Sequence, residues 1–200
     1  MRKEKNIEKL LGPWKDPDVL EKFLEKGCAR DHKFLNRNRT IEISWHRLHH
    51  HARDFILSEK RLKILDVGCG NGATLEVFRY YGHEAIGLDK PQIYSPMIES
   101  QGLKSVPHDG GSVPYPFEDN EFDLVICWGA ITFFRPIEKW AHVLDEFARL
   151  SKSAIILAPN IGSTYDKGRP HIESWKPSGG FRCTATGYEH KYRWDKGAGS

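Results

Sequence analysis

The segment KILDVGCGNG, residues 63–72, has the composition of a loop that touches a ligand. A strand-like apolar run leads through Asp66 into Gly68, Gly70 and Gly72. Glycine weakens an ordinary helix or strand by roughly 0.5–1 kcal/mol relative to alanine. Three glycines at alternate positions therefore indicate a backbone that turns sharply or that a ligand approaches closely.

The spacing around this loop points to the chemistry of nucleotide binding. Gly68, Gly70 and Ala73 satisfy the dinucleotide fingerprint G-x-G-x-x-G/A. Asp89 follows at about the distance expected for a carboxylate that holds a ribose. The helix after such a loop also offers free N–H groups to a ligand. The fingerprint alone leaves a nicotinamide-dependent oxidoreductase open as one alternative.

Alternating strands and helices must position this loop. Five strand-like runs are expected between residues 62 and 160, namely LKILDV, EAIGLD, KSVPHD, FDLVICW and AIILAPN. Helices are expected near 72–81 and 136–150. The strands are apolar on both faces, which is typical of parallel strands covered by helices on two sides. The predicted fold class is therefore α/β, a doubly wound, mostly parallel Rossmann-like sheet in an α-β-α sandwich.

The N-terminal part, residues 1–60, is predicted to be a helical extension or cap. One helix is expected over 16–27, where an Asp-Pro pair can start it and a glycine can end it. A second is expected over about 40–58, because its apolar residues recur every three or four positions. Thr40 is the expected cap of this second helix.

Residues 61–200 form the predicted ligand-binding domain. The segment FRCTATGYEHKYRW near its end indicates a hairpin or two short strands around Gly187. The sequence alone leaves open whether this short C-terminal region completes the sheet.

Three longer stretches resemble the class I S-adenosylmethionine-dependent methyltransferases and, within them, the type 11-like group. ILDVGCGNG resembles motif I of that family, with a matching spacing to HEAIGLD. VPHDGGSVPYPFEDNEFDLVICWGA resembles the stretch with which the family reads adenine, and EFARLSKSAIILAPN resembles the segment leading to its fifth strand. The resemblance covers about residues 60–160. It implies a Rossmann-like fold, S-adenosyl-L-methionine as cofactor, and methyl transfer.

The resemblance also implies a set of cofactor-binding residues. Asp89 would accept hydrogen bonds from ribose hydroxyls, and Asp109 would accept one from the adenine amino group. Asp66 suits the positive charge of the sulfonium and ammonium groups. The full set is Asp66, Gly68, Cys69, Gly70, Gly72, Asp89, Lys90, Asp109, Gly110, Trp128 and Gly129. In this set the Gly110 backbone lies close to the ring, and Trp128 with Gly129 flanks the methionine end.

The acceptor is expected to be a small polar metabolite or a glycan, possibly anionic. The chain lacks the loops after the fourth strand that the adenine, amide and protein-arginine enzymes share, because it has CWGAITFF there. Two alternatives stay open: an RNA or other nucleic-acid methyltransferase, and a non-catalytic subunit that binds the cofactor. The sequence does not identify the oligomeric state.

No catalytic residue follows from the sequence, because aligning a methyl donor with its acceptor needs no general base unless the acceptor must lose a proton early. Tyr165 and His171, expected in the loop after the fifth strand, are candidate bases. Arg169, Lys176 and Arg182 could pair with phosphate or carboxylate, although solvated surface charge is the expected role. His46 and His50 stand one helical turn apart, but no third ligand is apparent, so no metal is predicted.

Charge and composition favour a reducing, cytoplasmic setting without a membrane span. Residues 1–60 hold 14 Lys and Arg against 10 Asp and Glu, residues 61–160 hold 9 against 13, and residues 161–200 hold 7 against 4. Basic flanks around an acidic middle would suit an anionic substrate, or simply a solvated surface. The four cysteines form no CxxC pair, and no window approaches the roughly 18 apolar residues of a membrane span.

Overall fold

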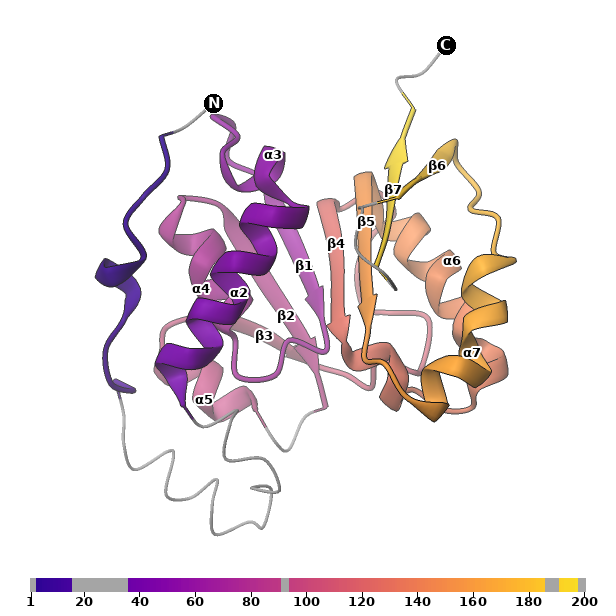
Figure 1. Ribbon diagram of the computed structural model, residues 1–200, viewed down its shortest axis with the longest axis horizontal. Helices are drawn as coiled ribbons and strands as arrows, with labels where there is room; N and C mark the ends of the chain where they lie inside the picture. Colours follow the sequence, from indigo (N-terminus) through magenta and orange to yellow (C-terminus); the bar gives the residue numbers. More distant parts are fainter. Residues whose placement is uncertain (1–2, 16–35, 91–93, 186–190, 198–200) are drawn as a thin grey trace, which may run out of the picture.

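A seven-stranded sheet forms the centre of the protein (Figure 1). A computed structural model describes residues 3–15, 36–90, 94–185 and 191–197. The strand order is β3-β2-β1-β4-β5-β7-β6, in which β1 to β5 are parallel and β7 runs antiparallel to both β5 and β6. The strands are β1 Lys63–Val67, β2 Glu84–Asp89, β3 Lys104–Pro107, β4 Phe122–Gly129, β5 Ser151–Pro159, β6 Phe181–Ala185 and β7 Tyr192–Lys196. The predicted fold class is confirmed.

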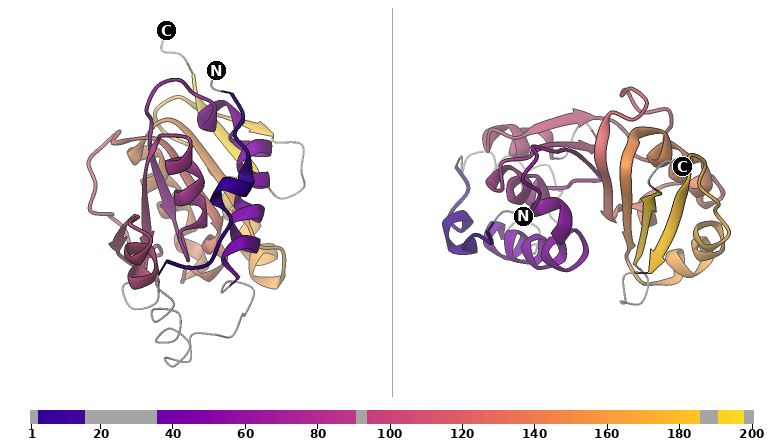
Figure 2. Two further views of the ribbon diagram at one scale, coloured as in Figure 1. Left: turned by 90° about the vertical axis from the view of Figure 1, so that its left-hand side faces the viewer. Right: turned by 90° about the horizontal axis from the view of Figure 1, so that it is seen from above.

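Helices cover both faces of the sheet (Figure 2). The α-helices are α2 Arg37–His51, α3 Arg53–Ile56, α4 Ala73–Tyr80, α5 Ser95–Ser100, α6 Trp140–Leu150 and α7 Ser163–Glu173. Three short 3₁₀ turns accompany them: η1 Ile7–Leu10, η3 Ala130–Phe133 and η4 Ile137–Lys139. No helix among the described residues has the length and apolar character needed to cross a bilayer.

The two faces of the sheet hold separate cores because successive strand residues point in opposite directions. On β1, Ile64 packs into the core shared with α2 and α4, whereas Leu65 packs into the core shared with α6 and α7. From α2, Ile41 and Leu48 are fully buried in the first core. The N-terminal helix α2 thus packs directly on the sheet, and the division of the chain at residue 60 stays a prediction.

The predicted second helix is broken into α2 and α3 at Ala52, whose φ of −134° and ψ of 28° are not helical. The expected cap was wrong. Asn36 caps α2 by accepting a hydrogen bond from the N–H of Arg39, and the Thr40 hydroxyl donates to the carbonyl of Arg37 at 2.9 Å. The helix expected over 16–27 lies outside the described residues.

The segment after β5 was predicted as a loop, and this was wrong. It forms α7, although Gly168 and Pro170 lie inside it. Gly168 lies against Trp140, where an added Cβ would come within 2.0 Å of the indole. Tyr165 and Ile172 are buried on the same side of the helix. Close packing at the glycine therefore outweighs the low helix propensity of this stretch.

The C-terminal region completes the sheet, which the sequence had left open. Strands β6 and β7 form the predicted hairpin, and Gly187 lies between them, outside the described residues. Trp194 is buried and its ring lies 5.6 Å from that of Tyr192 in a stacked arrangement. Strand β7 pairs with β5, so this hairpin extends the sheet beyond its parallel part.

Candidate cofactor site at the carboxyl edge of the sheet

The glycine loop lies where β1 ends and α4 begins, at the edge where ligands of parallel sheets bind (Figure 1). Gly68, Gly70 and Gly72 have φ angles of 75°, 53° and 81°, in the left-handed region. The N–H of Gly68 donates to the carbonyl of Leu88 on β2 at 2.7 Å. The loop is thus fastened to the neighbouring strand in a conformation that favours glycine.

Gly68 and Gly70 differ in what surrounds them. A Cβ on Gly68 would come within 2.0 Å of the Cβ of Ala130, so the loop and η3 touch directly. A Cβ on Gly70 would meet no atom of the described residues within 4 Å. Gly70 therefore borders open space, as a loop that receives a ligand requires.

Asp89 ends β2 and faces this loop. Its Oδ2 accepts from the N–H of Gly70 at 2.8 Å, and its Oδ1 accepts from the N–H of Lys90 at 2.7 Å. Burial raises the pKa of this carboxyl, and the two backbone donors oppose that rise. Each carboxylate oxygen has further acceptor capacity, so Asp89 can still bind two ribose hydroxyls.

Asp66 is the least solvated carboxylate of the predicted set, with 2% of its surface exposed. Burial, followed by the nearby charge of Asp89, raises its pKa to about 7. Its Oδ1 has no hydrogen-bond partner among the described residues. Buried polar atoms normally have partners, because leaving one unpaired costs about 1–3 kcal/mol. An ammonium group beside Asp66 would supply that partner, and a sulfonium would pair with its negative charge, so this residue fits either positive group of the expected cofactor.

Asp109 and Gly110, the residues predicted to contact adenine, follow the end of β3. Asp109 accepts from the N–H of Gly111 at 2.9 Å and lies 3.3 Å from the ammonium of Lys90. Partial burial raises the pKa of Asp109, but these two donors outweigh it and hold the pKa below its usual range. Gly110 packs against the ring of Phe134, where an added Cβ would come within 2.4 Å. The sequence did not lead us to Phe134, whose ring packs against Gly110.

Trp128 and Gly129 are the last residues of β4, which pairs with β1 on the side away from β2. The Gly129 carbonyl accepts from the Thr132 hydroxyl at 2.7 Å and from the Asn160 amide at 3.2 Å, which ties the ends of β4 and β5 together. Trp128 is half-buried and packs beside the core shared with α2. Its indole Nε1 is buried and has no hydrogen-bond partner in the part of the chain that the structure describes.

Cys69 and Gly72 contribute backbone rather than reactive side chains. The Cys69 thiol is buried against Gly87, and burial raises its pKa well above the ordinary value. The carbonyl of Cys69 accepts from the N–H of Gly72 at 3.0 Å, and Gly72 is the residue before α4. A buried, protonated thiol is a poor nucleophile, so we assign Cys69 a packing role.

Helix α2 borders the site with a row of polar residues that sequence reasoning did not place there. The Asn71 amide donates to Thr40 at 3.0 Å, and the Thr74 hydroxyl donates to Ser44 at 3.4 Å. Arg47 follows one turn later, within electrostatic range of Asp66. The spacing of 40, 44 and 47 along one helix face was the available signal.

The structure does not bring Tyr165 and His171 together as a catalytic pair. Both lie on α7 rather than in the predicted loop. Tyr165 is buried, and its hydroxyl lies 2.7 Å from that of Tyr192, whereas His171 is half-buried. A role for either as a base stays a prediction.

The other candidate cations and histidines lie on the surface. Arg169 pairs with Glu173 at 2.6 Å, and Lys176 and Arg182 are exposed. His46 and His50 are exposed on α2. Among the described residues, no group of three or more His, Cys, Asp or Glu side chains could hold a metal ion.

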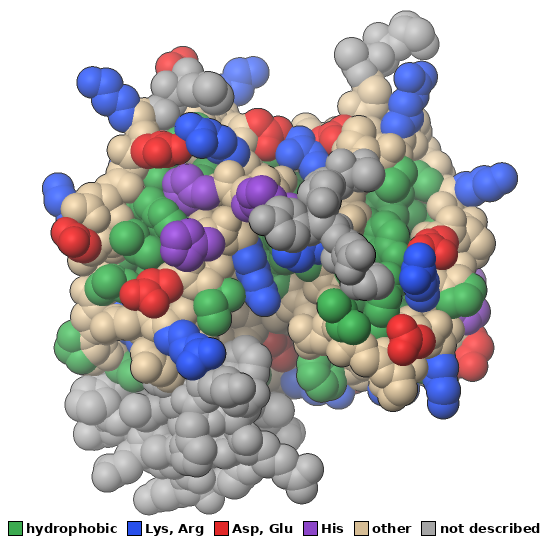
Figure 3. All heavy atoms as spheres, viewed as in Figure 1, with side chains coloured by type: hydrophobic (Ala, Val, Ile, Leu, Met, Phe, Trp, Pro, Cys, Tyr) green, Lys and Arg blue, Asp and Glu red, His purple; other side chains and the backbone are tan. Residues whose placement is uncertain are grey.

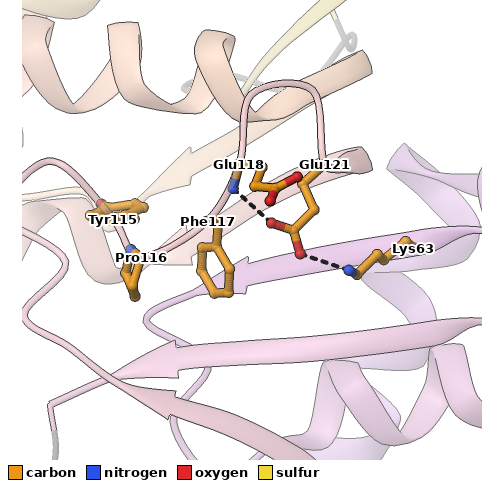
Figure 4. A pocket seen from close by; sticks show the side chains of 6 residues that line it. All are labelled: Lys63, Tyr115, Pro116, Phe117, Glu118 and Glu121. Atoms are coloured by element: carbon orange, nitrogen blue, oxygen red, sulfur yellow. Dashed lines mark hydrogen bonds and ion pairs between the residues drawn. The ribbon is translucent and has the colours of Figure 1, made fainter.

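A shallow depression lies at the opposite edge of the sheet, beside the first residue of β1 (Figure 4). The Lys63 ammonium lies 2.6 Å from a carboxylate oxygen of Glu121, and the second oxygen of Glu121 accepts from the N–H of Glu118 at 2.8 Å. The Lys63 ammonium and the Glu121 carboxylate thus neutralise each other. In addition, ligands of parallel sheets bind at the carboxyl ends of the strands, not at this edge. The candidate site is therefore the edge that holds Asp66 and Asp89.

Comparison with known proteins finds similarity to methyltransferases in the region that contains Asp66 and Asp89. The family model described as "Methyltransferase domain" matches residues 65–157. An uncharacterized methyltransferase, YcgJ of Bacillus subtilis, is 30% identical over 95 residues, which cover 45% of this chain and 36% of YcgJ. The 18S rRNA (guanine-N(7))-methyltransferase bud23 of Schizosaccharomyces pombe is 34% identical over 83 residues, or 40% of this chain and 31% of bud23.

A longer match and a solved structure extend the likeness beyond this region. The ubiquinone biosynthesis O-methyltransferase of Rickettsia prowazekii is 27% identical over 154 residues, which cover 71% of this chain and 60% of that protein. Magnesium protoporphyrin IX methyltransferase from Synechocystis PCC 6803, solved with bound SAM, has the same fold with a TM-score of 0.60 at 15% identity, covering 91% of this chain and 97% of that one. The chain spans only about a third of the length of the first two relatives.

Proposed function

We propose that the chain is a class I S-adenosylmethionine-dependent methyltransferase, which binds S-adenosyl-L-methionine and transfers its methyl group to a small polar metabolite or a glycan. The observation that carries this proposal is the pair of carboxylates at the sheet edge. Asp89 is held toward the open glycine loop by the N–H of Gly70, and Asp66 is buried with an unpartnered oxygen. The first suits a ribose, and the second suits a positive charge.

The chain's own residues would act mainly by binding and alignment. When bound, the cofactor supplies an electrophilic methyl group on a sulfonium. Positioning of donor and acceptor can lower a barrier by roughly 7–11 kcal/mol. Asp109 and Gly110 would hold the adenine end, Asp89 the ribose, and Asp66 the charged end, with Trp128 and Gly129 beside the methionine part. A general base is needed only for an acceptor that loses a proton early.

An RNA acceptor is the second candidate. Two observations favour it: the relative bud23 is named as an rRNA methyltransferase, and both ends of this chain carry a net positive charge. Binding to RNA through phosphate contacts would weaken steeply with salt. A small acceptor would show no such dependence.

The test is a screen with methyl-labelled S-adenosylmethionine and cell extract separated into metabolite, glycan and RNA fractions. We expect label in the metabolite or glycan fraction, and none with the Asp89→Ala variant. Label that enters RNase-sensitive material would replace the proposed acceptor class with RNA. Calorimetry on the same protein separates the remaining cases: cofactor binding without any transfer would favour a non-catalytic subunit, and no binding would refute the proposal.

A further inference from the structure

Four side chains from three distant parts of the chain meet on the face of the sheet that α2 covers. Arg47 and His51 come from α2, Trp128 from β4, and Lys191 from the residue before β7. The Arg47 guanidinium lies 6.0 Å from the centre of the Trp128 ring, and the His51 ring lies 5.9 Å from it. Lys and Arg side chains occupy the middle of this face, between α2 and the β5–β7 half (Figure 3).

Strand register places Lys191 on the same face as Trp128, with β5 between them. Trp128 pairs with Ala158 on β5, and Leu157 pairs with Tyr192 on β7. Because β5 and β7 are antiparallel, the residue before Tyr192 follows Leu157 toward Ala158. Lys191 therefore continues a row that runs from β4 through β5, and it lies within electrostatic range of both Arg47 and His51.

Among the residues that the structure describes, no carboxylate forms an ion pair with the Arg47 guanidinium, and the charge of Asp66 acts on it only from within electrostatic range. Arg193 on β7 is different, because its guanidinium binds Asp54 at 2.6 Å and Asp195 at 2.8 Å. The fold thus pairs one arginine near this face with two carboxylates and leaves Arg47 over an aromatic ring. Such a cation is available for a ligand.

His51 would contribute a hydrogen-bonding group rather than a charge. Burial, followed by the neighbouring charge of Lys191, lowers its pKa to about 4, so that the imidazole is neutral at pH 7. The positive charges in the cluster are therefore those of Arg47 and Lys191. The half-buried Trp128 ring offers a flat apolar surface beside them.

We propose that Arg47, His51 and Lys191 form an anion-binding subsite beside Trp128 that takes a carboxylate or phosphate group of the methyl acceptor. This inference rests on the proposed function, since it assigns the acceptor side of the same site. The sheet order β1-β4-β5-β7 puts Lys191 on the far side of Trp128 from Asp66. The subsite thus extends away from the residues that suit the ribose and adenine.

The cofactor itself carries one carboxylate, which is the main competing ligand for these cations. The cluster reaches from Arg47 to Lys191, and Lys191 lies beside β7, three strands from Asp66 on β1, which is farther than one carboxylate held beside Asp66 would extend. The distinction can be measured, because S-adenosylhomocysteine retains that carboxylate. Protein saturated with S-adenosylhomocysteine leaves only the acceptor side available.

The experiment is an NMR titration with inorganic phosphate and, separately, with acetate, at constant ionic strength and with S-adenosylhomocysteine at saturation. The variants are Arg47→Gln, Arg47→Lys and Arg39→Gln. Arg39 is the matched control, because it is exposed on the same helix and, among the described residues, its side chain contacts none of those in the proposed subsite. The affinity of each variant for S-adenosylmethionine is measured by calorimetry, and its folding by circular dichroism.

We expect Arg47→Gln to weaken binding of at least one anion about tenfold or more. Arg47→Lys should retain most of the affinity, and Arg39→Gln should bind as the wild type does. Preference for phosphate or for acetate identifies the acceptor's acidic group. Equal anion binding in wild type and Arg47→Gln would overturn the proposal. So would a matching loss of S-adenosylmethionine affinity, which would assign Arg47 to the cofactor's carboxylate. If the wild type binds no cofactor, the proposed function fails, and titration of the free protein still decides whether the anion subsite exists.

Discussion

Replacement of Asp66 by asparagine should stabilise the free protein while weakening its binding of the cofactor. In the folded state the pKa of Asp66 is raised to about 7, chiefly by burial, against an ordinary value of 3.8. Between these values the unfolded chain has released the proton and the folded chain retains it. Stability therefore falls as pH rises from about 4 to 7, by about 1.4 kcal/mol per pH unit and roughly 4 kcal/mol in all. Asparagine does not titrate, so the variant should lack this loss.

The assay is urea unfolding of wild type and Asp66→Asn at pH 4.5 and pH 8. At pH 8 we expect the variant to be more stable by up to roughly 4 kcal/mol, and at pH 4.5 the gap should shrink to about 1 kcal/mol. Asp109→Asn is the control, because the pKa of that half-exposed carboxyl lies below its usual range and the substitution should give no such gain.

Binding measurements complete the test of Asp66. Affinity for S-adenosylmethionine should rise with pH through about 7 in the wild type, because the carboxylate must ionise to meet a cation, and should stay flat in Asp66→Asn. A larger loss with S-adenosylmethionine than with the uncharged sulfur of S-adenosylhomocysteine would place Asp66 near the sulfonium. The reasoning is refuted if the two proteins share the same pH dependence of stability, or if asparagine destabilises at pH 8.

Three further substitutions separate binding from folding. Asp89→Ala should weaken S-adenosylmethionine binding by about 10- to 100-fold, because charge-assisted hydrogen bonds contribute about 1.5–3 kcal/mol, with little change in melting temperature; unchanged affinity in calorimetry would contradict the ribose assignment. Gly70→Val should abolish cofactor binding with a native circular dichroism spectrum, since its side chain would enter the open space at the loop; retained binding would argue against that role. Gly168→Ala should lower the free energy of unfolding by about 1–3 kcal/mol through its contact with Trp140, and denaturant titration showing no loss would mean that α7 can move away.

The sequence predicted the cofactor side of the site because that side depends on local features. A strand end followed by glycines specifies a turn, and Asp89 ends the next strand in a parallel sheet, so both positions follow from spacing along the chain. Their contact through the N–H of Gly70 agrees with that prediction. Helix α7 was missed because Gly168 and Pro170 signal a break, and only the distant Trp140 shows why the glycine is accommodated.

The proposed acceptor side could not be predicted because it depends on contacts between remote segments. Arg47 and His51 stand in a histidine-rich run whose metal-like spacing drew attention to His46 and His50 instead. The Arg193 guanidinium donates to the His51 carbonyl at 3.2 Å across 142 residues, which holds the end of α2 close to β7. No local pattern encodes such a contact.

Opposite charges on the two sides of Trp128 separate the two halves of the proposed reaction. Asp66 lies on β1 and Lys191 beside β7, with β4 and β5 between them. A cationic donor is favoured on the first side and an anionic acceptor on the second, because each charge attracts its own ligand and disfavours the other. Asp66→Asn should then reduce affinity for the donor without changing phosphate binding, and Arg47→Gln should do the reverse. If the two substitutions act on the same ligand, the two sides form one site, and the charges hold a single zwitterion.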